Sequence, residues 1–492
     1  MLTIVSSSEI EKKRVEMLVI PVCEDADIHP PALMPALLHQ ARDLKGFGAD
    51  NEDIVFYAPS GVLAAQVMIV GLGKKDKLDG EMLRRACGRA IKKCIQKEIS
   101  EALFVVPFTE VLHMEPDVIL EAMVEGALLG NYQFDRFKKP KHPSLLKIAF
   151  AVPKGSVQHA RRLSQKINII CDGTLLAREW VIIPSNLKRP EQFARSLVQA
   201  AEKENLKTEV LDHTALKKKN FGALLAVAAG SDANARMVIL EHDPGNTAQT
   251  LALVGKGVTF DSGGINLKPQ GSLEDMKMDM AGAAAVAATM ITAARLKLPV
   301  RLIGVLPLVE NMPSGSATRP GDIVKSFSGK TIEINNTDAE GRLILADALS
   351  YVIQTYKPDA VVDLATLTGA CVVALGERIA GVFSPDDEMS ETLVASGRKT
   401  FERCWKMPLP EDYRDLLKSE FADICNITGL KWGGAITAAL FLSEFTENTR
   451  WMHVDIAGPA YVKKETAYCG VGGTGFGVRL LCDWIEQMVK TE

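Results

Sequence analysis

Residues 251–264 read LALVGKGVTFDSGG, and this stretch decides the class of fold. Its apolar run is continuous rather than alternating, which is typical of a strand in a parallel sheet buried on both faces. Other strands are predicted at residues 300–309, 330–334, 360–367 and 451–458. Helical patterns such as AGAAAVAATMITAARLK, at 281–297, separate them. The second half of the chain is therefore predicted to be an α/β domain with a mainly parallel central sheet flanked by helices.

The first half of the chain alternates shorter strands with helices. A chain of 492 residues is too long for one simple core, so two domains are expected. The predicted division is a smaller N-terminal α/β domain at 1–157, a connecting helix at 158–181 and a larger C-terminal domain at 182–492. The first 22 residues contain an apolar run too short for a signal peptide, and they are predicted to form two strands with a hairpin-like connection.

Bulk composition narrows the classes of function. The formal net charge is -4, which offers no global attraction for nucleic acid or an anionic membrane, and no stretch resembles a membrane span. Nine cysteines are scattered without CxxC spacing, so we expect neither a disulfide framework nor a zinc–cysteine site, and we expect a cytoplasmic location. The eight histidines include no HExxH motif. Any metal site would therefore depend on oxygen ligands.

Charged residues stand inside one predicted strand and at the ends of predicted strands. Lys256 stands between two glycines inside an apolar strand, where a lysine is costly unless it is paired or neutral. Asp261 ends that strand, at the edge where parallel α/β sheets form their sites. Asp279 directly precedes a helix of small residues, so helix capping is an equally good interpretation for this residue alone.

The stretch NNTDAEGRL, at 335–343, places Asp338, Glu340 and Arg342 at alternate positions between a strand and a helix. Taken singly, Glu340 and Arg342 would be a solvated pair. Taken together with Asp261 and Asp279, the acids gather at one edge of the sheet, where they would repel one another without cations. Two divalent metal ions would resolve this repulsion, and Mg²⁺, Mn²⁺ and Zn²⁺ all accept oxygen ligands.

Several ordered motifs then become informative. They are GKGVTFDSGGINLKP, MKMDMAGAAAV, ENMPSG, RPGDI, NTDAEGRL, DLATLTGA and HVDIAGPA. Together they resemble the leucyl aminopeptidase family, the cytosol aminopeptidases, over roughly residues 170–480. The resemblance implies a metallopeptidase that releases N-terminal amino acids, preferentially leucine and other apolar residues, from short peptides by means of water activated by two metal ions.

The same resemblance implies roles for individual residues. Asp261 and Glu340 would bridge both metal ions, which would be Mn²⁺ or Zn²⁺, with Mg²⁺ as an alternative. Asp338 would complete one site, and Lys256 and Asp279 the other. Lys256 would have to be neutral to act as a ligand, and two adjacent dications can lower a lysine pKa that far.

The remaining implied roles concern substrate and proton transfer. Lys268 would stay charged and polarise the scissile carbonyl, although a lysine before a proline is more often a surface residue. Arg342 would hold a bicarbonate ion that acts as general base, supported by the backbone of residues 366–369. The walls of the pocket for the first substrate side chain would be Met276, Thr366, Gly369 and Ala460.

Partners and rival functions also follow from these patterns. The resemblance implies a homohexamer that acts on short peptides. DNA is a further candidate partner through the basic stretches at 138–142 and 216–220, but the acidic net charge makes solvated loops the better interpretation.

The glycines of CGVGGTGFG, at 469–477, match GxGxxG without the strand that a dinucleotide site needs. The acids alone would also suit another two-metal hydrolase, such as a phosphoesterase. A catalytically inactive relative is disfavoured because every expected ligand is present.

Overall fold

The computed structural model describes residues 1–29, 35–107, 111–245 and 249–490. It divides the chain into two compact units, Met1–Cys171 with Lys463–Val471, and Asp172–Val462 with Gly472–Glu492. Both units are layered α/β structures, which confirms the predicted two-domain fold class. Among the described residues, no helix is long and apolar enough to cross a membrane.

The first unit is built on a six-stranded sheet in the order β1-β6-β5-β2-β4-β3, with only β3 antiparallel to its neighbour. The strands are β1 Leu2–Ser6, β2 Val15–Val22, β3 Asp53–Tyr57, β4 Ala64–Gly71, β5 Glu101–Val105 and β6 Lys147–Val152. The helices are α1 Pro35–Arg42, α2 Gly80–Gln96 and α3 Pro116–Gly130, and the 3-10 helices are η1 Ser7–Lys12, η2 Lys75–Lys77 and η3 Lys154–Ser156.

The predicted hairpin at the start of the chain is wrong. β1 pairs in parallel with β6, and β2 lies between β5 and β4. Two strands that are separated by two others in the same sheet cannot share a tight turn, and the chain between them instead forms η1.

The segment Lys463–Val471 packs within the first unit, whereas the predicted boundaries placed it in the second domain. The Tyr468 hydroxyl donates to the Glu81 carboxylate at 3.2 Å, and Lys92 Nζ lies 2.9 Å from Glu465 Oε2. The backbone also approaches closely, since a Cβ atom on Gly88 of α2 would lie 2.6 Å from the carbonyl oxygen of Ala467. The other boundary falls within the helix α4, Val157–Ile182, which covers the predicted connecting helix.

The second unit has a nine-stranded sheet in the order β16-β15-β18-β14-β9-β11-β8-β7, with β10 also paired to β11. Its strands are β7 Lys207–Leu211, β8 Arg236–His242, β9 Thr250–Gly255, β10 Gly257–Asp261, β11 Arg301–Asn311, β14 Ala360–Ala365, β15 Ala380–Phe383, β16 Cys404–Lys406 and β18 Arg450–Asp455. The central pairings, from β18 through β14 and β9 to β11, are parallel. The mainly parallel sheet is thus confirmed, with antiparallel pairings toward its edges.

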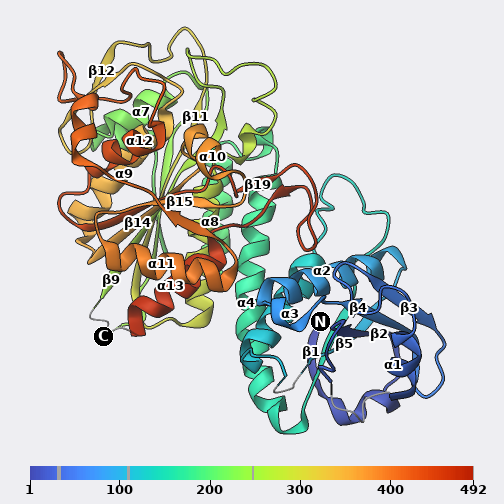
Figure 1. Cartoon of the computed structure of the whole chain (residues 1–492). Helices are drawn as coiled ribbons and strands as arrows, with labels where there is room; N and C mark the ends of the chain where they lie inside the picture. Colours follow the sequence, from blue (N-terminus) through green and yellow to red (C-terminus); the bar gives the residue numbers. More distant parts are fainter. Residues whose placement is uncertain (30–34, 108–110, 246–248, 491–492) are drawn as a thin grey trace. The chain divides into compact units, whose positions relative to one another are not determined.

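Helices cover both faces of this sheet (Figure 1). On one face α8 and α5 contact the sheet, and α13 contacts both α8 and α11. On the other face α9 contacts the sheet, α7 and α12. The helices are α5 Pro190–Glu202, α6 His213–Lys218, α7 Gly222–Ala228, α8 Ala281–Leu296, α9 Glu340–Tyr356, α10 Gly369–Leu375, α11 Asp387–Thr400, α12 Gly434–Ser443 and α13 Val478–Lys490. Short 3-10 helices are η4 Ser185–Leu187, η5 Met276–Met278 and η6 Glu411–Leu417. Small residues let α8 lie close to the sheet, since a Cβ on Gly282 would meet the carbonyl of Leu364 at 2.2 Å.

Two predicted strands differ from the structure. The run at 251–260 is two strands, β9 and β10, interrupted at Lys256. The run at 330–334 lies in a separate three-stranded sheet of β12 Asp322–Lys325, β13 Thr331–Ile334 and β17 Ile424–Cys425. Only alternate side chains of β13 are buried, so this strand has one solvated face and is not a central strand. A two-stranded ladder of β19 Tyr461–Val462 and β20 Gly472–Gly473 completes the unit.

Candidate metal centre

Four acidic residues of the second unit stand at strand ends and helix starts. Asp261 ends β10, Asp279 lies just before α8, Asp338 lies in the turn after β13, and Glu340 is the first residue of α9. Asp261, Asp338 and Glu340 each offer a carboxylate oxygen within 4.8 Å of the others. The fold therefore brings together three acids that span about eighty residues of sequence.

Lys256 connects the fourth acid to this group. Its Nζ atom lies 2.8 Å from Asp279 Oδ1, 2.8 Å from Glu340 Oε1 and 2.8 Å from the carbonyl oxygen of Thr366. Lys256 lies at the interruption between β9 and β10, and its backbone N–H donates to the Leu364 carbonyl of β14 at 3.0 Å. Asp279 Oδ1 also accepts from the Thr366 hydroxyl at 2.7 Å. The capping interpretation of Asp279 is wrong, since α8 has Met280 at its N-cap and no side-chain cap.

Lys268 supplies the second positive charge. Its Nζ atom lies 2.7 Å from Asp261 Oδ2 and 2.5 Å from Asp338 Oδ1. Its side chain is only 16% exposed, so it is not the surface residue that a lysine before proline usually is. The ammonium groups of Lys256 and Lys268 thus occupy the cationic positions between four carboxylates.

The electrostatics of the cluster favour additional positive charge. Burial raises the pKa values of Asp261, Asp279 and Asp338 above their ordinary range. For Lys256 burial opposes the charged form, but the charges of Asp279, Glu340 and Asp261 outweigh it and raise the pKa. The neutral amine that a metal ligand requires is thus disfavoured by these acids, and adjacent dications would have to reverse that preference.

Unpartnered carboxylate oxygens show that the residues fit metal ions. Asp279 Oδ2 and Glu340 Oε2 are buried and accept no hydrogen bond from any residue that the structure describes. Such oxygens are costly inside a protein unless a donor or a cation satisfies them. A site with this many buried carboxylate oxygens suits hard divalent cations.

Arg342 lies in the first turn of α9, next to the acids in sequence. Its side chain is buried, so the interpretation of Glu340 and Arg342 as a solvated pair is wrong. Arg342 Nη1 donates to the carbonyl of Asn426 at 2.7 Å, whereas its Nε has no acceptor in the described chain. Burial lowers the pKa of Arg342 to about 10, against the opposing charges of Glu340 and Asp455. The group therefore remains a cation at neutral pH.

Comparison with known proteins agrees with this geometry. Residues 175–482 match the catalytic domain of the cytosol aminopeptidase family, and residues 36–141 match its N-terminal domain. The chain belongs to the cytosol aminopeptidase family. It is therefore a metal-dependent peptidase hydrolase.

Individual relatives are similar over nearly their whole length. A probable cytosol aminopeptidase of Syntrophotalea carbinolica is 45% identical, with 92% of this chain and 91% of the relative covered. A probable cytosol aminopeptidase of Chlorobium limicola is 38% identical, with 98% of this chain and 99% of the relative covered. Among solved structures, the bottromycin maturation enzyme BotP shares 34% identity with a TM-score of 0.86 over 97% of this chain and 100% of its own. Its complex with Mn gives a TM-score of 0.87 over 96% and 99%.

One residue that the sequence analysis of this aminopeptidase missed is Asp455, which contacts the loop after β14. Asp455, at the end of β18, accepts from the backbone N–H groups of Leu367 and Thr368 at 3.1 Å and from the Thr368 hydroxyl at 2.7 Å. Its carboxylate therefore shapes the loop at 366–369. The signal was present, since an aspartate ends the apolar strand of HVDIAGPA as Asp261 ends β10.

The predicted walls of the substrate pocket lie on separate segments. Met276 is half-buried in η5, Thr366 is buried and contacts Asp279, and Gly369 is exposed at the start of α10. Ala460 is buried, and its carbonyl accepts from the Thr474 amide at 3.0 Å. The Thr366 hydroxyl donates to the Asp279 carboxylate, and the Met276 carbonyl accepts from the Asp279 backbone N–H at 3.3 Å. The shared role of the four residues as a pocket stays a prediction.

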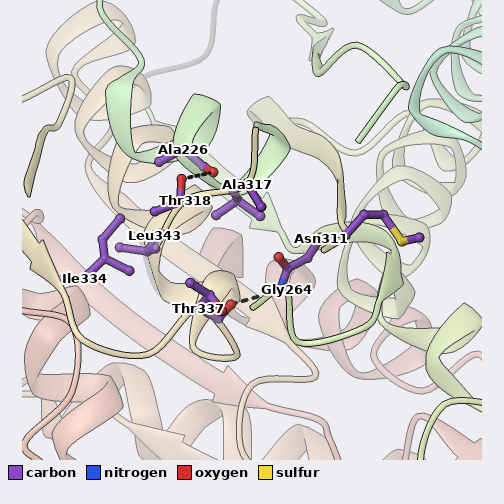
Figure 2. A pocket seen from close by; sticks show the side chains of 10 residues that line it. Ala226, Gly264, Asn311, Ala317, Thr318, Ile334, Thr337 and Leu343 are labelled. Carbon is purple, nitrogen blue, oxygen red and sulfur yellow. Dashed lines mark hydrogen bonds between the residues drawn. The ribbon is translucent and has the colours of Figure 1, made fainter. Parts of the chain in front are cut away.

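A small cavity lies behind the ligand-bearing segments (Figure 2). Its lining includes Gly264, Asn311, Thr337 and Leu343, and its volume is about 10 Å³. That space is about what one water molecule needs, so the cavity cannot take a substrate side chain.

Proposed function

We propose that this cytosol aminopeptidase removes N-terminal leucine and other apolar residues from short peptides, with two divalent metal ions bound per subunit. The observation that carries the proposal is the buried cluster of acids with unpartnered oxygens, held around two lysines. The metal ligands would be Lys256, Asp261, Asp279, Asp338 and Glu340.

The proposed ligands have two groups of neighbours in the structure. Lys256 is in direct contact with Asp279 and Glu340, whereas Lys268 is in contact with Asp261 and Asp338. Lys256 and Asp279 would help to hold one ion and Asp338 the other, and Asp261 and Glu340 would contribute to both sites. The ions would be Mn²⁺ or Zn²⁺, with Mg²⁺ as an alternative, and would supply an acidified water and a Lewis acid.

The charged residues beside the acids would orient the substrate. The free amino terminus of a peptide would bind at one of the two metal positions, which would make the enzyme an exopeptidase. Lys268 would polarise the scissile carbonyl and stabilise the oxyanion as charge develops. Arg342 would hold bicarbonate, the proposed general base, with backbone support from residues 366–369.

Selectivity would come from the wall formed by Met276, Thr366, Gly369 and Ala460. A thioether and small residues around an open glycine suit an apolar side chain of moderate size. The space beyond the Gly369 Cα is open, since no described heavy atom lies within 4 Å of a Cβ placed there. We further propose a homohexamer in the cytoplasm, for which size-exclusion chromatography with light scattering is the test.

The decisive experiment is hydrolysis of leucine p-nitroanilide by the purified chain. Activity is measured before chelation, after chelation, and after adding back Mn²⁺, Zn²⁺, Mg²⁺ or Co²⁺. N-acetyl-leucine p-nitroanilide is the matched substrate control, because it lacks the free amino group. Metal-restored cleavage of the free amine alone supports the proposal, whereas equal cleavage of the acetylated substrate contradicts an exopeptidase.

A further inference from the structure

Asn311 ends β11 beside the first of the acidic segments. In the parallel register of β10 and β11, Asn311 is the partner of Asp261. Its side chain is buried, and its amide Nδ2 donates to Asp261 Oδ1 at 2.8 Å and to the carbonyl oxygen of Thr337 at 2.9 Å. One side-chain amide thus connects two segments that each carry a predicted metal ligand, because Asp338 directly follows Thr337.

We propose that Asn311 is a positioning residue that sets the separation and orientation of these two ligand segments and so determines the affinity for metal. The inference rests on the proposed metal site and adds a residue that never touches the ions. Second-layer hydrogen bonds of this kind orient metal ligands and typically change metal affinity by about 10- to 100-fold when removed.

The contacts of Asp261 show what the amide does. Oδ1 of Asp261 accepts from Asn311 and from the backbone N–H of Gly263 at 2.9 Å. Two donors on one oxygen fix the rotation of the carboxylate, and the other oxygen, Oδ2, then faces Lys268 Nζ at 2.7 Å. Without the Asn311 amide, Oδ1 of Asp261 would keep a single donor, the Gly263 N–H, and the carboxylate would be free to rotate further.

The turn that carries Asp338 is tied to the same loop. The Thr337 hydroxyl donates to the carbonyl of Gly263 at 2.6 Å, and the Thr337 backbone N–H donates to Asn266 Oδ1 at 2.9 Å. Figure 2 shows Thr337, Asn311 and Gly264 together at one side of the small cavity. These bonds align the two segments, and Asn311 is the member that joins a ligand carboxylate to the turn.

The chemistry of the position requires an amide. Two N–H bonds on one planar nitrogen can serve two acceptors at once, which neither a serine hydroxyl nor an aspartate carboxylate can do. An aspartate would place a second carboxylate at hydrogen-bond distance from Asp261. Removal of the side chain would enlarge the small cavity rather than bring in another donor.

The test measures metal binding directly. The full chain, stripped by chelator, is titrated with Mn²⁺ and free Mn²⁺ is followed by electron paramagnetic resonance, for wild type, Asn311→Ala and Asn311→Asp. Asn131→Ala is the matched control, since the Asn131 side chain in the first unit also bridges backbone groups. Its Nδ2 donates to the Leu145 carbonyl at 3.0 Å, and its Oδ1 accepts from the Leu145 backbone N–H at 2.8 Å. Thermal unfolding of the metal-free variants checks that each is folded.

We expect both Asn311 variants to bind Mn²⁺ about 10- to 100-fold more weakly, with the number of sites restored at saturating metal. Asn131→Ala should bind like wild type. Unchanged affinity in Asn311→Ala, or an equal loss in Asn131→Ala, would overturn the positioning role while the metal site stands. A wild-type chain that binds no Mn²⁺ would overturn the proposed metal site itself, and one that binds Mn²⁺ without cleaving peptides would overturn only the proposed substrate.

Discussion

Replacement of Lys268 by alanine separates the chemical role of this residue from a structural one. Lys268 Nζ contacts Asp261 and Asp338, both predicted metal ligands. If Lys268 polarises the substrate carbonyl, its loss removes a charge that matters in the transition state. If it serves instead to hold the acids in place, its loss should disturb metal binding.

The expected magnitude follows from the contacts. Loss of one preorganised oxyanion donor lowers kcat by about 100- to 1,000-fold. The Asp261 carboxylate keeps other partners, because it accepts from Gly263 and Asn311. The turn that carries Asp338 keeps the hydrogen bond from the Asp338 backbone N–H to Asn336 Oδ1. The ligand segments should therefore hold their geometry, and removing a competing ammonium group cannot weaken the attraction for dications.

The assay combines steady-state kinetics on leucine p-nitroanilide with metal content by plasma mass spectrometry on the same sample. Lys325→Ala is the control, since Lys325 is an exposed lysine of the same unit, on β12. We expect kcat to fall by about 100-fold or more for Lys268→Ala with two metal ions per chain retained, and no change for Lys325→Ala. Loss of metal in parallel with activity would show that Lys268 acts through the ligands and would refute the assigned role.

Three further predictions test the buried charges of the second unit. Lys256→Met should destabilise the metal-free protein by about 3–5 kcal/mol in urea unfolding, because Asp279 and Glu340 lose their buried cation, and an unchanged midpoint would contradict the pairing. Arg342→Ala should lower kcat and abolish any activation by added bicarbonate, so a variant that still responds to bicarbonate would exclude Arg342 as its holder. Burial raises the pKa of Asp347 to about 7, so its contribution to stability is full below about pH 4 and is lost as pH rises through 7. Asp347→Asn should therefore remove up to about 4 kcal/mol of the pH dependence of the unfolding free energy. An unaltered pH profile of the unfolding free energy would contradict this prediction.

Sequence patterns determined much of this protein because the relevant physics is local. Continuous apolar runs predicted the buried parallel strands, and small-residue and amphipathic periods predicted helices such as α8 and α9. Asp261 could be placed at one edge of the sheet because the carboxyl ends of parallel strands meet there. Asp338 follows a strand of the separate three-stranded sheet, so this rule does not explain its position. The ordered motifs then pointed to the family that the comparisons show.

Tertiary structure alone decided which groups touch. The contact between Lys256 and Asp279 joins residues 23 apart, and Lys256 lies at the interruption between β9 and β10. The side-chain amide of Asn311 donates to Asp261, its partner on the neighbouring strand. Asp455 accepts hydrogen bonds from a loop that lies nearly ninety residues earlier in the chain. Likewise the parallel pairing of β1 with β6 replaced the expected hairpin. The local sequence pattern shows only that a polar group at a strand end will need a partner. Strand order and register determine which residue becomes that partner, and both are set only when the whole sheet forms and packs against its helices.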